Sequence, residues 1–128
     1  MTVKFKVVEK SQPGVAGGGE KKFYATVVSK GEVTLDDMTS LIEEISTVSG
    51  ADIRAVLYAM VSVASRSLTN GQIIRLGDLG SLRVSISSEP ADTSEKVTSS
   101  VIKGSKVIFS PGPKLKVTLD NLKFEKTS

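Results

Sequence analysis

The sequence predicts an α+β fold in which a helical hairpin is followed by three strands and preceded by a β-hairpin. Apolar residues recur at helical spacing over residues 35–45 and again over 53–68. The period changes to two over residues 74–86 and 107–109, as expected for strands. The 128 residues are 39% hydrophobic, which is ordinary for one globular domain.

The first thirty residues carry a strand pattern of their own. Val3, Phe5 and Val7 alternate with lysines, and a second β-like run follows at residues 23–29. Residues 13–19 between them are rich in glycine, which is costly inside regular structure, so this stretch predicts the flexible loop of a wide hairpin. A phosphate-binding loop would require Gly-Lys-Ser/Thr and a helix to follow, and neither does.

Capping signals delimit the two helices. Thr34 stands three residues before Asp37, a carboxylate variant of the capping box. Ser49 and Gly50 end the first helix and can cap the second, which ends at Asn70-Gly71.

The second helix carries a long apolar stripe. The stripe consists of Ile53, Val56, Leu57, Met60, Val61, Ala64 and Leu68. Two helices and three strands make a small core that leaves part of this stripe uncovered. Association of two copies covers it most simply, so we expect a homodimer.

Residues 88–100, between two of the predicted strands, are polar and are expected to form a solvated segment outside the core. Pro113 favours a short helix in the last segment, although Val117 and Thr118 favour a strand there.

The composition excludes several classes of chemistry. The chain has no cysteine and no histidine, so disulfides, thiolate nucleophiles, imidazole bases and the common zinc ligands are ruled out. The acidic pairs at residues 36–37 and 43–44 lie off the apolar stripes and are interpreted as solvated charges. We therefore expect no enzyme, no cofactor and no small-molecule substrate. The longest nearly apolar run, residues 55–64, is too short to cross a bilayer, so no membrane partner is expected and a cytoplasmic location is the default.

The charge is unevenly distributed. Residues 1–31 have a net charge of +4, residues 32–100 of −5 and residues 101–128 of +4. Such asymmetry can create a local anion-binding face on a chain whose total charge is only +3.

Two motifs connect these patterns to a known family. GDLGSLRVSIS stands at Gly77–Ser87, and KVIFSPGPKLK stands at Lys106–Lys116. Together they resemble the HU/IHF family of bacterial histone-like DNA-binding proteins, with a glycine turn at residues 79–82 and a Phe-x-Pro-Gly turn at residues 109–112. The similarity covers roughly residues 31–119, and the closest fit is to a divergent branch with an Arg-Leu-Gly-Asp-Leu-Gly-Ser core and an added N-terminal strand region.

The resemblance implies an intertwined homodimer. In each subunit a helical hairpin packs on a three-stranded antiparallel sheet with an extended β-arm, and the two arms reach around double-stranded DNA in the minor groove. The chain then divides into an N-terminal β extension, residues 1–30, and an HU/IHF-like DNA-binding domain, residues 31–128.

The arm departs from the family pattern. Its tip region has three acids, Glu89, Asp92 and Glu95, against Lys96. No proline stands at the position of the family's DNA-kinking wedge, and Pro90 is expected nearer the base of the arm. Because acids oppose binding to phosphates, these departures argue against sharp bending.

The candidate DNA-binding residues cluster around the arm and the Pro-Gly turn. They are Arg83, Lys96, Lys103, Lys106, Lys114 and Lys116, with Gly80 and Ser81 as possible donors of backbone N–H and hydroxyl groups to a phosphate. Lys116 matches a basic family position. The glycine has an alternative role, which is to permit a bulge or tight turn.

The leading hypothesis is a non-enzymatic, nucleoid-associated protein that binds duplex DNA as a dimer with little sequence preference. The alternative is a family fold repurposed as a dimerisation or assembly module without DNA binding, in which the N-terminal strands offer an edge to a protein partner.

Overall fold

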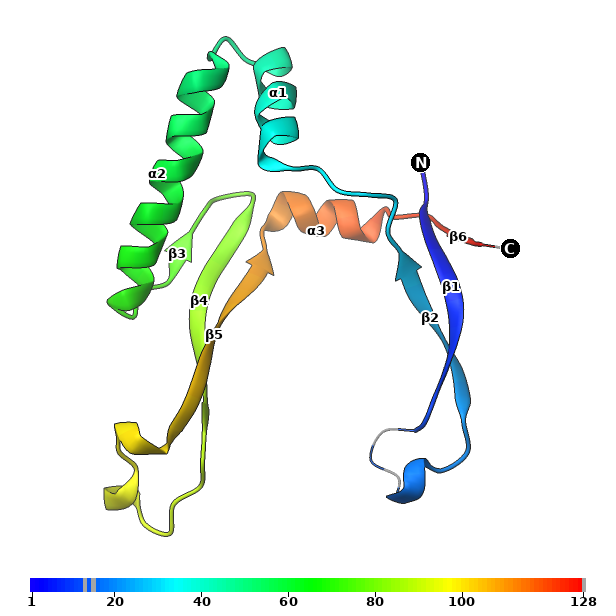
Figure 1. The fold of residues 1–128 in the computed structure, drawn as a ribbon, viewed down its shortest axis with the longest axis vertical. Helices are drawn as coiled ribbons and strands as arrows, with labels where there is room; N and C mark the ends of the chain where they lie inside the picture. The colour runs from blue at the N-terminus through cyan, green and yellow to red at the C-terminus, as the bar shows by residue number, and fades with distance from the viewer. Residues whose placement is uncertain (13, 15, 128) are drawn as a thin grey trace. The chain divides into compact units, whose positions relative to one another are not determined.

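A computed structural model describes residues 1–12, 14 and 16–127 of the chain (Figure 1). The chain forms two compact units. The N-terminal sheet unit comprises Met1–Met38 and Asp120–Ser128, and the helix–arm unit comprises Thr39–Leu119. In the part of the chain that the structure describes, no helix is both long enough and apolar enough to span a membrane.

The N-terminal sheet has the strand order β2-β1-β6. Strands β1 (Val3–Lys10) and β2 (Lys22–Val28) pair antiparallel, which confirms the predicted hairpin. Its loop contains a 3-10 turn at Ala16–Gly18, while Pro13 and Val15 of the predicted flexible loop lie outside the described residues.

Strand β6 (Phe124–Lys126) pairs parallel to β1, a pairing that the sequence analysis did not foresee. The end of the chain therefore belongs to the same sheet as its beginning. The division of the chain at residue 30 stays a prediction.

Helix α1 (Leu35–Ile45) begins with the predicted capping box. The Thr34 N–H donates to Asp37 Oδ2 at 3.1 Å, and the Asp37 N–H donates to Thr34 Oγ1 at 3.2 Å. Two unpaired groups at the helix start are thereby satisfied.

Helix α2 (Gly50–Thr69) begins and ends where the sequence predicts. The Asp52 N–H donates to Ser49 Oγ at 3.3 Å, and Gly71 follows the helix with a φ of +74°. The Glu43 carboxylate accepts a hydrogen bond from the Gly50 N–H. This acid, which was interpreted as a solvated charge, thus connects α1 to the first turn of α2.

The helix–arm unit contains the second sheet, with strand order β3-β4-β5 and antiparallel pairing throughout. Strand β3 (Ile74–Arg75) is short and contacts α2, whereas β4 (Gly80–Ser88) and β5 (Ile102–Pro111) form a long two-stranded arm (Figure 1). The predicted three-stranded antiparallel sheet is confirmed.

The arm ends in a polar loop with two 3-10 turns, Ser94–Lys96 and Ser99–Val101. Pro90 lies two residues beyond Ser88, the last paired residue of β4, at the opposite end of the ladder from Gly80. It therefore stands at the start of the tip loop, ahead of both 3-10 turns. After β5, helix α3 (Pro113–Asp120) confirms the predicted short helix.

Very little apolar surface is buried. Among the described residues, Ile53 is the one buried hydrophobic residue, with 5% of its surface exposed. The large apolar residues of α2 that remain exposed are Val56, Tyr58, Met60, Val61 and Val63. Val84, Ile86, Val107 and Phe109 of the arm are exposed as well. A single chain does not cover these faces, which in soluble proteins mark sites of association.

Candidate nucleic-acid interface

The sheet of the helix–arm unit has one apolar and one polar face. Residues directly opposite on neighbouring strands share a face. Arg75 lies opposite Ser81, which lies opposite Ser110. Arg83 stands two residues after Ser81 on β4 and so lies on the same face. Ser85 follows two residues later, and Lys106 of β5 lies opposite it. Arg75, Arg83 and Lys106 therefore stand on one side of the sheet.

Two turns meet at the base of this face. The Leu76 N–H donates to the Gly80 carbonyl at 2.7 Å, and the Gly112 N–H donates to the Leu79 carbonyl at 3.0 Å. Both glycines are buried. A Cβ on Gly112 would lie 2.4 Å from the carbonyl oxygen of Asp78, so a side chain there would clash with the backbone.

The turns and strands enclose an open hollow of about 430 Å³, called here the arm-base hollow. It is lined by Arg75, Gly77, Gly80, Ser81, Arg83, Ser110, Pro111, Gly112, Pro113 and Lys116. Three of these side chains are cationic and two are hydroxyls, and no carboxylate belongs to the described residues that line it. Such a set of donors suits an anion such as a phosphate group.

The structure brings four of the predicted site residues together in this hollow, namely Gly80, Ser81, Arg83 and Lys116. Lys114 is the second residue of α3 and does not line it.

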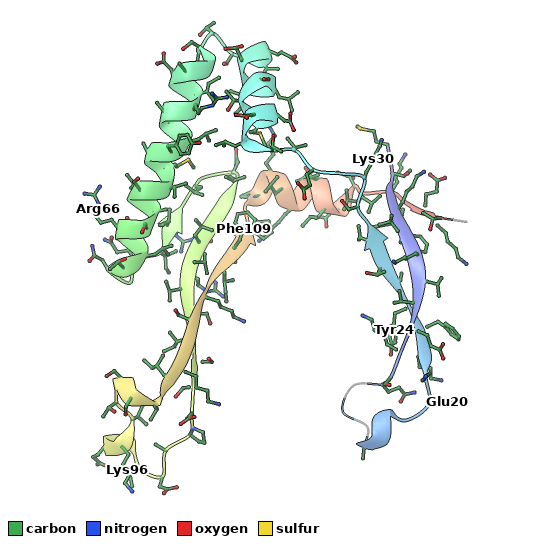
Figure 2. The ribbon with its side chains drawn as sticks, viewed as in Figure 1. Glu20, Tyr24, Lys30, Arg66, Lys96 and Phe109 are labelled. Atoms are coloured by element: carbon green, nitrogen blue, oxygen red, sulfur yellow. The ribbon has the colours of Figure 1, made fainter. Side chains whose placement is uncertain are left out.

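The remaining predicted lysines follow the arm outward. Lys106 lies on the polar face, opposite Ser85. Lys103 falls at the irregularity between the Gly104–Ser87 and Ile102–Ser88 pairs, where it is the extra residue of a bulge. Lys96 lies in the tip loop, at the distal end of the arm from Phe109 (Figure 2).

Sequence reasoning missed Arg75 and Ser110 as members of the site. Arg75 stands between Ile74 and Leu76, and this alternation already indicated that it shares the polar face of the sheet. For Ser110 the signal was weaker, because its contribution depends on the pairing with Ser81 across the arm.

Comparisons with known proteins show the family and the fold of the chain. A protein-family model for HU-HIG, described as an HU domain fused to wHTH, Ig, or glycine-rich motif, matches residues 1–126. The match includes the N-terminal thirty residues, which the motif comparison left outside. No curated protein matches the chain.

A solved structure shares the fold. It is a crystal structure of a protein from Bacteroides vulgatus ATCC 8482, described as a putative bacterial DNA binding protein, with a TM-score of 0.67 and 13% sequence identity. The alignment covers 98% of this chain and 48% of that one, so the chain spans about half of its neighbour's length.

Proposed function

Since the chain belongs to the HU-HIG family of HU domains fused to other motifs, we propose that it is a non-enzymatic protein that binds duplex DNA through the arm-base hollow and the polar face of the arm. The HU resemblance found in the sequence is confirmed by the family match. The similar fold of the Bacteroides vulgatus protein, which is described as a putative DNA binding protein, supports the same proposal.

The arm-base hollow carries the proposal. Arg75, Arg83 and Lys116 surround it, and the hydroxyls of Ser81 and Ser110 complete a set of donors without a competing carboxylate in the lining. Contacts of this kind neutralise phosphates and position the protein, but they do not read bases. Binding with little sequence preference follows.

The active form in this proposal is a homodimer. With Ile53 as the one buried apolar side chain among the described residues, the stripe of α2 and the apolar face of the arm need a cover. A second copy supplies a matching apolar surface, because a twofold interface places the same patch on both subunits.

The arm tip limits what the protein does to DNA. Glu89, Asp92 and Glu95 outnumber Lys96 there, and repulsion of phosphates by these acids opposes a close approach of the tip. We therefore propose gentle shaping or coating of the duplex instead of sharp kinking. The same acids favour the alternative function, an assembly module that no longer binds DNA.

Titration of a fluorescently labelled duplex, followed by anisotropy at several salt concentrations, tests the proposal. If each dimer neutralises about 4–8 phosphates, the slope of log K against log salt is roughly −4 to −7. A slope near zero, or no binding at low salt by folded protein, would overturn DNA binding and favour the assembly module.

A further inference from the structure

The N-terminal sheet has two chemically different faces. Because β1 and β2 pair antiparallel with Val8 opposite Tyr24, alternate residues of each strand share a face. One face is mainly apolar, with Val3, Phe5, Val7, Phe23, Ala25, Val27 and Phe124 beside the charged Glu9 and Lys126. The other, called here the lysine face, carries Lys4, Lys6, Val8, Lys10, Lys22, Tyr24, Thr26 and Val28, with Glu125 at its edge.

Tyr24 lies in the middle of the lysine face. Lys22 stands two residues before it on β2, Lys10 is opposite Lys22, and Lys6 is opposite Thr26. The Tyr24 side chain is 40% exposed. The accessible ring of Tyr24, labelled in Figure 2, therefore has three lysines at neighbouring positions of its face according to the strand register.

The lysine face is electrostatically unfavourable by itself. Lys10 and Lys22 are directly opposite, and like charges at such positions destabilise a strand pair. Lys22 forms an exposed ion pair with Glu20, in which Lys22 Nζ lies 3.7 Å from Glu20 Oε2. No ion pair involves Lys6 or Lys10 within the described residues. An anionic ligand would relieve this repulsion.

The acids of the sheet leave the centre of this face clear. Glu125 is opposite Lys4 at the edge strand β6, and its Oε2 accepts a hydrogen bond from Thr2 Oγ1 at 3.0 Å. Glu9 is opposite Phe23 and so belongs to the apolar face.

We propose that the lysine face is a second nucleic-acid site, which binds single-stranded nucleic acid by stacking a base on Tyr24 and contacting phosphates with Lys6, Lys10 and Lys22. A ring among cations, spread along a strand, is the arrangement by which proteins bind unpaired strands without sequence preference. Bases of an intact duplex are stacked inside and do not reach such a ring. The site is therefore distinct in ligand and in position from the arm-base hollow, and it does not rest on the function proposed above.

The fluorescence of Tyr24 gives a direct test. The chain has two tyrosines and no tryptophan, so Tyr58→Phe leaves Tyr24 as the single reporter. Unlabelled oligo(dT) added to this full-length variant should quench the tyrosine emission in a saturable way, since stacking places the base on the ring. Saturable binding of the oligonucleotide by anisotropy without any change in emission would overturn stacking on Tyr24.

Substitutions provide the second test, with labelled oligo(dT) and the full chain. Tyr24→Leu should weaken binding about 5- to 150-fold, whereas Tyr24→Phe, which keeps the ring, should bind nearly as the parent does. Lys6→Gln with Lys22→Gln should reduce the salt slope by about 1.4. Lys126→Gln is the matched control, because Lys126 lies opposite Phe5 on the other face of the sheet, and it should leave the slope unchanged.

The two nucleic-acid sites are separated by crossing the variants. Arg75→Ala with Arg83→Ala should weaken duplex binding and leave oligo(dT) binding intact. Absence of oligo(dT) binding, or equal affinities of Tyr24→Leu and Tyr24→Phe, would overturn the proposed site whatever the duplex titration shows. The same full-length protein is also titrated with labelled polyglutamate. Binding of polyglutamate without any binding of oligo(dT) would assign the face to an acidic protein partner instead.

Discussion

A Cβ atom on Gly80 would lie 2.3 Å from the carbonyl oxygen of Ser110. It would also lie 2.8 Å from the ring of Phe109, and the φ of +146° at this glycine disfavours any other residue. The backbones of β4 and β5 thus approach closely at the base of the arm. Next to this contact, Ser81 and Ser110 lie opposite one another and line the arm-base hollow.

Gly80→Ala should therefore destabilise the protein by about 2 kcal/mol or more, because strain in φ and a steric clash act together. Urea unfolding measures the loss as a lower midpoint. Gly104→Ala is the matched control, since a Cβ there would meet nothing nearer than Ser87 Oγ at 4.0 Å. Equal midpoints for the two variants would show that β4 and β5 do not approach as described.

The capping box of α1 predicts that the free energy of unfolding depends on pH. Hydrogen bonds from the backbone and side chain of Thr34 hold the pKa of the exposed Asp37 carboxyl below its usual value. A carboxyl with a lowered pKa stabilises the fold above the ordinary Asp pKa of about 3.9, and this contribution is lost as the pH falls through the folded pKa.

The stability difference between the parent and Asp37→Asn should thus be constant near neutral pH and shrink below about pH 4. Chemical unfolding at a series of pH values measures it. Thr34→Ala removes the side-chain partner and should reduce the same pH dependence. A difference that persists undiminished at pH 2 would contradict the role of the ionised carboxylate.

Local chemistry made much of the fold predictable. The capping pair Thr34 and Asp37, the stop at Asn70-Gly71 and the alternation around Arg83 each depend on residues within a few positions of one another. The motif at the Pro-Gly turn added the long-range pairing of β4 with β5, which no periodicity specifies.

Long-range relationships account for what was missed. Strand β6 has three residues, and its partner β1 lies at the other end of the chain, so no local pattern indicates the pairing. Arg75 was overlooked because its membership of the hollow depends on the register with Ser81. The position of Pro90 required knowing where the β4 ladder ends.

The exposed stripe of α2 leads to a prediction about assembly. Val61 is 67% exposed in a single chain, and the proposed dimer buries it. Val61→Glu would place an unpaired carboxylate in that interface, at a cost of several kcal/mol. The variant should be monomeric or largely unfolded at concentrations where the parent is dimeric.

Sedimentation equilibrium and the concentration dependence of Tm measure this effect. Ser62→Glu introduces the same charge one residue along α2, away from the apolar stripe, and should leave the dimer intact. A dimeric, stable Val61→Glu protein would place the interface elsewhere.

The arm-base hollow makes the most specific prediction for DNA binding. Arg75 and Arg83 lie on the same face of neighbouring strands and line the same hollow. If each neutralises one phosphate, Arg75→Ala with Arg83→Ala should reduce the salt slope of duplex binding by about 2 per subunit. Because such contacts do not read bases, the loss should be similar for duplexes of different sequence.

Anisotropy titrations at several salt concentrations, with two unrelated duplexes, measure both quantities. Arg66→Ala removes an exposed arginine from the last turn of α2, outside the hollow, and should change the slope little. If Arg66→Ala flattened the slope as much as the double variant, binding would depend on total charge and not on the hollow. A loss confined to one duplex would instead indicate base recognition by one of the two arginines.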